Sequence, residues 1–518
     1  MTTTVINAGI LNSSEAPPTD YDRTPSHTRM IREMDVYVPM RDGVKICVDI
    51  YRPDTTEKLP ALLAFAIYNK DFQGPDVNQA LPAQPAWTPL WTGPLEAGDT
   101  HFFVSRGYIH VIGSPRGVGK SEGGGSRQWD SYDLIEWIAK QPWCDGKIGM
   151  VGISGFGAEQ FHVAKQQPPS LKAIFPFDPR GAYGTLGSFR EEYPGGVLHL
   201  FRYLVGHFSA MHQNRGAPGP LPEPRETWWR EAMANPDYRM YPNILNMIAQ
   251  KGQHMPPIFD IFLDPHEKPG SAEQAEADLK KIKIPSYTGS GWYGYTYKTH
   301  LNGAQNWFSN LRSPKKLMLS GPAHLDRPFR AFHNELLRWF DHWLKDIDTG
   351  IMAEPPVKLM IRTGGNKEPY QFRFEDEWPI ARTKWTKLYV NIDRPFSPAA
   401  DSVEGRLLAE PPAQPQSITY EASMPTRAGL VPTTANAASA ALHGRMGITL
   451  ETEPMKADTE ITGPLMANLW VSSTSKDMDI FITLRNVDAG GKDIWESGQH
   501  GQPVPLTKGW LRASHREL

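Results

Sequence analysis

One stretch of the chain decides the fold: residues 147–157 read KIGMVGISGFG. Its apolar first half predicts a buried strand, residues 158–166 predict a helix, and Ser154 stands at the sharp turn between the two. Such a turn exposes a nucleophile. The helix N-terminus behind the serine offers N–H groups and partial positive charge to an oxyanion.

Glycines surround Ser154 because side chains at this turn would collide with the adjacent backbone. The usual five-residue form of the elbow ends in glycine. Here Phe156 holds that place and Gly157 follows. On this stretch alone, a purely structural turn between strand and helix stays open.

The segments around the turn alternate between strand and helix signals. Two short apolar runs, 61–67 and 108–112, suit strands that are buried on both faces of a parallel sheet. An apolar stripe at helical spacing occupies 130–140, and 171–177 predicts the strand after the Ser154 helix. This alternation predicts a three-layer α/β sandwich.

Composition divides the chain into four regions. Residues 1–30 are polar and aperiodic, which predicts a flexible arm, and 193–280 are irregular, which predicts a helical cap over the active-site edge. The α/β domain therefore occupies 31–192 and 281–350. After a Pro-rich linker only short β signals occur, so 357–518 are predicted to form an all-β jelly-roll domain. The stronger helical pieces of the cap are 198–211, 228–233 and 244–248.

The overall composition excludes several classes of function. With 518 residues and a net charge of -3, the chain has no basic field for nucleic acid or an anionic membrane. Cys47 and Cys144 cannot build a disulfide framework and lack metal-ligand spacing, so no metal and no cofactor are expected. No targeting segment begins the chain, and no apolar run approaches the roughly 18 residues that span a bilayer, so a cytoplasmic protein is expected.

A serine nucleophile needs a base, and His324 is the candidate. It follows the apolar run 316–319 in a Gly-Pro turn, and loops at the C-terminal ends of parallel strands are where such sheets place reactive groups. A solvent-exposed loop histidine is the alternative. Four other histidines fall in helical or unremarkable contexts and are predicted to be structural: His162, His300, His333 and His342.

Seven motifs follow one another along the chain: Arg41-Asp42-Gly43-Val44, Tyr68 after a buried strand, Arg116-Gly117 with Ser121-Glu122-Gly123, Trp143-Cys144-Asp145-Gly146, Gly152-x-Ser154-x-x-Gly157, Gly291-Trp292-Tyr293 and Gly321-Pro322-x-His324. In this order the set resembles the cocaine esterase and X-prolyl dipeptidyl peptidase family, which also includes glutaryl acylases and α-amino acid ester hydrolases. The resemblance covers the chain from about Met34 to its C-terminus. It implies an α/β-hydrolase domain, a helical cap and a C-terminal jelly roll.

The resemblance also implies roles for individual residues. Ser154 matches the nucleophile and His324 the base. Tyr68 matches the tyrosine whose hydroxyl joins the Gly155 N–H in the oxyanion hole, whereas its own sequence context indicates only a tyrosine at the end of a strand. The implied mechanism is attack by the serine, proton transfer to the histidine, and deacylation by water or another acceptor.

The family's catalytic aspartate is missing from this chain. In the family it follows the Gly-Trp-Tyr motif, but Gly294 stands there. Asp178 is the candidate substitute, because it follows the strand 171–177 and should emerge at the same sheet edge as Ser154. A salt bridge from Asp178 to Arg180 is the open alternative.

These residues predict a serine-dependent hydrolase or acyl transferase that acts on an ester or amide bond of a small, apolar or aromatic substrate. Because Gly294 replaces the family acid, two alternatives stay open. One is an elimination, ring-opening or cyclisation with Ser154 and His324 as acid and base, and the other is a catalytically silent binding protein. The candidate substrate contacts are aromatic, although tryptophans in helices more often pack in a core: Phe156, Trp228, Trp229, Trp292 and Tyr295.

The jelly-roll domain is expected to be short of strands. Family members continue beyond the segment that resembles 509–514, so a chain ending at Leu518 would leave one edge of the sandwich uncovered, unless the sequence itself is truncated. Such an edge would be shielded or paired with another subunit, which leaves a homo-oligomer open.

Overall fold

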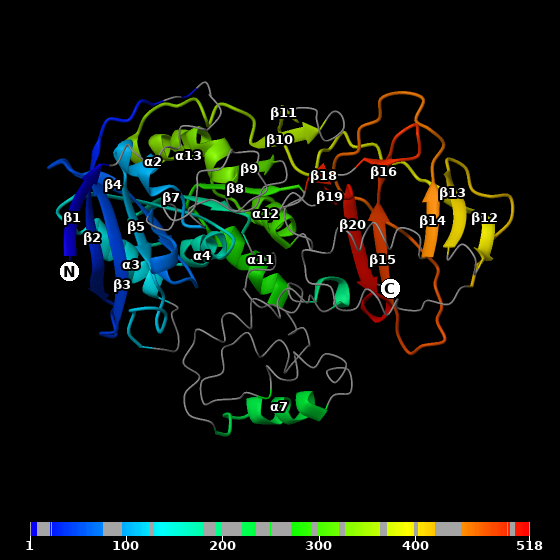
Figure 1. Cartoon of the computed structure of the whole chain (residues 1–518), viewed down its shortest axis with the longest axis horizontal. Helices are drawn as coiled ribbons and strands as arrows, with labels where there is room; N and C mark the ends of the chain where they lie inside the picture. Colours follow the sequence, from blue (N-terminus) through cyan, green and yellow to red (C-terminus); the bar gives the residue numbers. More distant parts are fainter. Residues whose placement is uncertain are drawn as a thin grey trace.

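A single sheet of 11 strands organises the chain as far as Glu375, and Figure 1 shows it in the computed structural model. The structure describes residues 2–7, 21, 23–75, 96–123, 129–179, 193–197, 219–234, 249, 271–292, 299–320, 327–362, 370–397, 402–419, 447–494, 496–497 and 503–516. The strand order in this sheet is β1-β2-β3-β5-β4-β6-β7-β8-β9-β10-β11. The strands are β1 (Thr2–Asn7), β2 (Arg29–Pro39), β3 (Lys45–Pro53), β4 (Leu59–Phe65), β5 (Ile109–Gly113), β6 (Cys144–Ile153), β7 (Leu171–Phe177), β8 (Ser286–Gly291), β9 (Lys315–Ser320), β10 (Val357–Arg362) and β11 (Tyr370–Glu375).

The central part of the sheet is parallel. Strands β5, β4, β6, β7, β8, β9 and β10 pair in parallel one after another. Their apolar residues are buried on both faces, as the apolar runs predict for parallel strands covered on each side. Because the strands are parallel, their C-terminal ends meet at one edge of the sheet.

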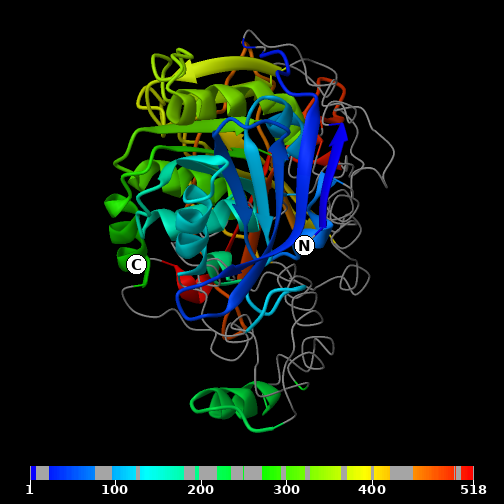
Figure 2. The same cartoon turned by 90° about the vertical axis from the view of Figure 1, so that its left-hand side faces the viewer.

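Helices cover both faces and complete the three-layer sandwich that the sequence predicts (Figures 1 and 2). Ala61 and Leu63 of β4 face a core shared with α3 (Asp130–Ala139), α4 (Gly155–Ala164), α11 (Ser271–Lys281) and α12 (Thr299–Asn310). Leu62 faces the opposite core, which α2 (Thr100–Ser105) and α13 (Arg327–Lys345) cover. In the part of the chain that the structure describes, no helix is long and apolar enough to cross a membrane.

The predicted cap is described only in part. Its helix α7 (Arg225–Ala234) confirms the helix predicted at 228–233. It stands apart from the sheet at the bottom of Figure 1. The helices predicted at 198–211 and 244–248 lie outside the described residues.

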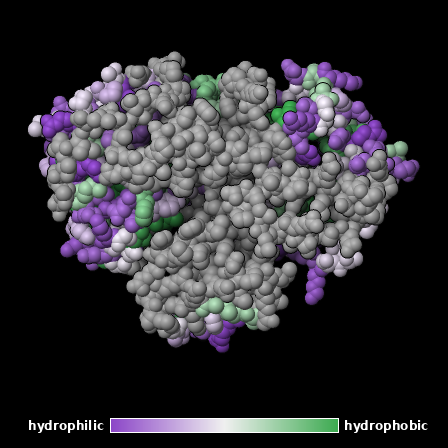
Figure 3. Space-filling model, in the orientation of Figure 1, coloured by the Kyte–Doolittle hydropathy of each residue, from purple (hydrophilic) through white to green (hydrophobic). Residues whose placement is uncertain are grey.

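The described elements beyond Glu375 are strands, apart from one short 3₁₀ turn, η5 (Ala513–His515). This all-β region agrees with the predicted second domain. Where residues are coloured at the upper right of Figure 3, hydrophilic and hydrophobic residues lie side by side. Large apolar side chains such as Met466 and Trp470 are exposed in this region. The strands are β12 (Tyr389–Ser397), β13 (Ser402–Leu408), β14 (Gly447–Glu451), β15 (Asp479–Leu484), β16 (Asn486–Val487), β17 (Asp493–Ile494), β18 (Glu496–Ser497), β19 (Pro503–Val504) and β20 (Thr507–Arg512).

Strand β20 contacts the start of the cap region. The indole N–H of Trp510 donates to the carbonyl of Pro194 in the short turn η2 (Pro194–Gly196), at 2.7 Å. A Cβ on Gly195 would lie 2.4 Å from the Trp510 carbonyl oxygen, and a Cβ on Gly196 would lie 2.4 Å from the His515 ring. This close approach therefore requires glycine at both positions.

The large sheet includes two strands from the region that the sequence assigns to the second domain. Strand β10, assigned from sequence to the second domain, pairs in parallel with β9, and β11 then pairs with β10. The first sheet therefore extends past the linker to Glu375. A short alternating strand carries no local signal for which of two sheets it joins.

The N-terminal segment also differs from the predicted flexible arm over 1–30. Strand β1 pairs antiparallel with β2 at the edge of the sheet, seen facing the viewer in Figure 2. Tyr21 and Arg23 donate hydrogen bonds of 2.8 and 2.9 Å to Asp341, whose side chain is completely buried. The N-terminal segment thus supplies hydrogen-bond donors to a carboxylate more than 300 residues away in the sequence. Because its sequence lacks periodicity, it gives no sign of this contact.

Candidate active site

Ser154 occupies the strained turn that the sequence predicts, between the end of β6 and the start of α4. Its backbone angles are φ 57° and ψ -111°, a conformation that L-residues with a side chain rarely adopt. The turn is held by hydrogen bonds from the Ser154 N–H to the Phe177 carbonyl, at 3.0 Å, and from the Ala158 N–H to the Ser154 carbonyl, at 2.9 Å. The side chain is therefore fixed at the C-terminal edge of the parallel strands.

At the glycines on either side of Ser154, neighbouring atoms leave no room for a side chain. A Cβ on Gly152, where φ is +143°, would lie 2.3 Å from the Cβ of Phe156. A Cβ on Gly157 would lie 2.8 Å from the Phe177 carbonyl oxygen. Glycine is thus needed at position 157, where helix α4 passes close to the end of β7. Phe156, a predicted substrate contact, is 1% exposed and packs with its ring centroid 5.4 Å from that of Tyr68.

Tyr68 lies beside the first residue of α4. It follows β4, the strand paired with β6, so the two C-terminal ends are neighbours. A Cβ on Gly155 would lie 3.2 Å from the Tyr68 hydroxyl oxygen. The tyrosine hydroxyl and the N-terminus of α4 therefore converge next to Ser154, where donors could hold an oxyanion.

A buried lysine ties the loop of Tyr68 to two neighbouring strands. The ammonium of Lys70, 1% exposed, lies 2.8 Å from carboxylate oxygens of Asp35, Asp49 and Asp71. Burial alone would lower the pKa of Lys70, but the hydrogen bonds to these carboxylates raise it above its ordinary value. The lysine stays charged and anchors the loop to β2 and β3.

Asp178 emerges at the same sheet edge as Ser154, where the sequence places it. It directly follows β7, has φ 45°, and is 1% exposed. Its carboxylate accepts a hydrogen bond of 2.5 Å from the Ser290 hydroxyl and one of 3.3 Å from the Gly291 N–H, both at the end of β8. Its two predicted partners, His324 and Arg180, lie outside the described residues, as do Gly294 and Tyr295.

In the part of the chain that the structure describes, the histidine that contacts Ser154 is His300. Its Nε2 lies 3.2 Å from Ser154 Oγ, and both residues are buried, with His300 4% and Ser154 6% exposed. The sequence predicted a structural role for His300 and did not anticipate this contact with Ser154. Its place in the first turn of a helix, soon after a strand ends at the active-site edge, was the signal in the sequence.

The predicted tryptophan contacts fall into two groups. Trp228 and Trp229 lie on α7 of the cap and are half-buried. Trp292 follows β8, where its indole N–H donates to the Met360 carbonyl at 2.9 Å and its ring packs against Trp378. Its polar atom is therefore engaged by β10 of the sheet.

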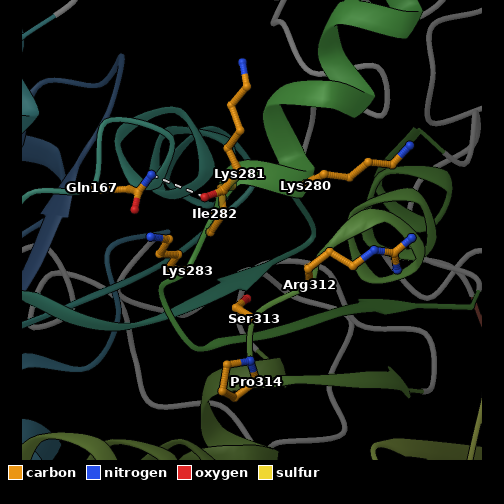
Figure 4. Close-up of a pocket in the computed structure, with 8 residues that line it drawn as sticks. All are labelled: Gln167, Lys280, Lys281, Ile282, Lys283, Arg312, Ser313 and Pro314. Atoms are coloured by element: carbon orange, nitrogen blue, oxygen red, sulfur yellow. Dashed lines mark hydrogen bonds between the residues drawn. The ribbon is translucent and has the colours of Figure 1, made fainter.

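A surface hollow of about 560 Å³ lies at the opposite edge of the sheet from Ser154. It is formed where α4, α11 and α12 end and where β8 and β9 begin, and Figure 4 shows its cationic side chains extending in different directions. Cations at helix C-termini offset the negative end of the helix dipole. The lining residues are Gln167, Lys280, Lys281, Ile282, Lys283, Arg312, Ser313 and Pro314.

Comparison with protein families identifies two consecutive matches. Residues 42–326 match the X-Pro dipeptidyl-peptidase (S15 family) model, and residues 349–518 match the X-Pro dipeptidyl-peptidase C-terminal non-catalytic domain. The first match contains Ser154, His300 and the predicted base His324. The second begins near the predicted linker.

Individual relatives agree with these matches. The cocaine esterase of Rhodococcus sp. is 26% identical over 501 residues, covering 89% of this chain and 81% of the esterase. An α-amino acid ester hydrolase structure superposes with a TM-score of 0.62 at 19% identity, covering 96% of this chain and 84% of the other. A CocE/NonD family hydrolase from Staphylococcus aureus gives a TM-score of 0.59 at 21% identity, covering 95% and 77%. The two structures share the fold with this chain.

Proposed function

The chain belongs to the X-Pro dipeptidyl-peptidase (S15) family and is a serine hydrolase of the α/β-hydrolase fold, and we propose that it cleaves or transfers the acyl group of a small ester or amide. The observation that carries the proposal is the strained elbow of Ser154. The Ser154 hydroxyl lies within hydrogen-bond distance of the His300 imidazole, and the Tyr68 hydroxyl lies beside the next residue, Gly155. A hydroxyl, a base and oxyanion donors are the parts that acyl transfer needs.

The proposed reaction starts with attack of Ser154 Oγ on the acyl carbon. The Tyr68 hydroxyl and the Gly155 N–H hold the negative oxygen that forms. His324 accepts the serine proton, on the strength of its motif, and Asp178 orients His324 from behind, on the strength of its position at the same edge. Water or another acceptor then removes the acyl group.

The substrate is proposed to carry an apolar or aromatic group. Support comes from the aromatic side chains of the cap, Trp228 and Trp229 on α7, together with Trp292 and Tyr295 in the segment that follows β8. The side chain of Phe156 supports the site from its core side. Location in the cytoplasm and self-association stay predictions from the sequence.

A fluorophosphonate probe tests the proposal directly. The expected result is one covalent adduct, located by mass spectrometry on the peptide that contains Ser154, in parallel with hydrolysis of small aryl esters. Turnover without labelling would favour an acid/base reaction such as an elimination. The absence of both turnover and labelling would favour a binding protein.

Replacing Tyr68 with phenylalanine is expected to lower kcat by about 10²–10³-fold, because one oxyanion donor is lost. KM should change little, since the hydroxyl acts mainly in the transition state. Steady-state kinetics on an activated ester checks this. Tyr37→Phe, at an exposed position on β2, is the matched control and should leave both constants unchanged. A change confined to KM would assign Tyr68 to substrate binding instead.

A further inference from the structure

Helices α4 and α12 are held side by side by two contacts with the same spacing. Near the start of the helices, Ser154 Oγ meets His300 Nε2 at 3.2 Å. Two turns further on, Phe161 and Trp307 stack with centroids 3.5 Å apart and planes 8° apart. Phe161 comes seven residues after Ser154 and Trp307 comes seven residues after His300, so the two helices run side by side in the same direction and both begin near Ser154.

The stacked pair fixes the place of His300. Trp307 is 2% exposed and Phe161 is completely buried, and both belong to the core beneath the sheet. Residues Leu301 and Ala304 bury the adjoining side of α12 against β9 and β10. The helix therefore cannot turn about its axis without losing core contacts, and His300 is held against the nucleophile.

We propose that His300 is a second catalytic base for Ser154, able to accept at its own Nε2 the proton that the proposed function assigns to His324. The inference rests on the proposed function and adds to it a residue that the family motifs do not contain. Of the histidines in the described part of the chain, His300 is the one whose hydrogen bond reaches Ser154. Buried histidines elsewhere serve the core: His110 contacts the Thr100 hydroxyl at 2.9 Å, and His333 stacks on Phe102.

The step is a proton transfer coupled to attack. The neutral imidazole accepts the Oγ proton at Nε2 while Oγ forms its bond to the acyl carbon and the carbonyl electron pair moves to oxygen. Collapse of the tetrahedral intermediate breaks the bond to the leaving alcohol or amine. That group takes the proton from Nε2, which restores the neutral imidazole.

The replacement of the family acid by Gly294 explains why the reaction would use a second imidazole. Asp178, the proposed substitute for that acid, also accepts hydrogen bonds from the Ser290 hydroxyl and the Gly291 N–H. A histidine that its carboxylate orients less firmly is a weaker base for serine, and complete loss of the triad acid costs about 10⁴-fold in a serine protease. A second base on the same hydroxyl offsets part of that loss. The N-terminus of α4, and that of α12 beside it, add positive partial charge near Ser154.

The test compares His300→Gln and His300→Ala with the wild-type enzyme in the rate of fluorophosphonate labelling of Ser154. Glutamine keeps a hydrogen-bonding group but cannot accept the proton, so both variants should be labelled at least about 100-fold more slowly. Added imidazole should partly restore labelling of His300→Ala and leave His300→Gln slow. His110→Gln, at a buried histidine away from the site, is the matched control and should be labelled at the wild-type rate. Circular dichroism melts on each variant show that the fold is retained.

The outcomes separate three roles. Slow labelling of His300→Gln with a wild-type melt supports the base. Fast labelling of His300→Gln with slow labelling of His300→Ala would overturn it in favour of a positioning hydrogen bond, and fast labelling of both would leave His300 structural. An unlabelled wild-type enzyme would instead contradict the proposed acyl transfer, so the two failures are distinct. Comparison with His324→Gln then shows whether the second imidazole is needed as well.

Discussion

Ser154→Ala is expected to lower turnover by up to about 10⁶-fold, the effect measured for the nucleophile of a serine protease. Without Oγ no acyl-enzyme can form, and what remains is rate enhancement by the oxyanion donors and by binding. The free energy of unfolding should change by no more than about 1.5 kcal/mol. Alanine keeps the Cβ and hence the strain of the turn, so only the hydrogen bond to His300 is lost.

Turnover is measured on an activated ester and stability by chemical denaturation. Ser105→Ala is the control, because Ser105 is a buried serine on α2 whose hydroxyl bonds a backbone carbonyl away from the elbow. It should keep full activity. Retained activity in Ser154→Ala would move the nucleophile elsewhere, whereas a large loss of stability would show that the hydroxyl mainly supports the fold.

Lys70→Met is expected to lower the free energy of unfolding by about 3–5 kcal/mol, since it leaves buried charge without a partner. Asp49 is 1% exposed and its carboxylate lies 2.8 Å from the Lys70 ammonium. Lys120→Met is the matched control: it removes a lysine that also contacts Asp35, at 2.6 Å, but is half exposed. An exposed pair of this kind contributes at most about 1 kcal/mol.

The pH dependence of the Lys70→Met deficit identifies its cause. Burial already raises the pKa of Asp49 in the wild-type protein, and removal of the lysine would raise it further. A carboxyl whose pKa is raised on folding costs stability above that pKa and costs less as the pH falls through it. The deficit should therefore be larger at pH 8 than at pH 5, and Asp49→Asn in the same variant should recover part of it. A pH-independent deficit equal to that of Lys120→Met would rule out the buried-charge explanation.

The sequence predicts those features of this protein that depend on neighbours along the chain. The elbow of Ser154 is predictable because its strain requires Gly152 and Gly157 within a few residues. Parallel strands such as β4 and β7 are predictable because burial on both faces leaves continuous apolar runs. The edge position of Asp178 follows from strand order alone.

Features that depend on contacts between residues far apart in the sequence could not be predicted from it. The contact of His300 with Ser154 and the stacking of Trp307 on Phe161 each join residues 146 positions apart in the sequence. The pairing of β10 with β9 and the anchoring of Tyr21 on Asp341 are likewise decided between remote segments. The place of Tyr68 beside α4 was predicted through family resemblance, which carries information on distant contacts that a single chain lacks.

The contact between β20 and the turn η2 limits how the protein can be recombined. A chimera joined at the linker would combine Gly195 and Gly196 with the C-terminal region of another protein. In the present chain, the Trp510 carbonyl and the His515 ring leave room only for a hydrogen atom at these two positions. Residues 194–196 and strand β20 therefore fit each other closely, although they are separated by more than 300 residues in the sequence. Exchange of the C-terminal region between relatives should succeed only when residues 194–196 are exchanged with it.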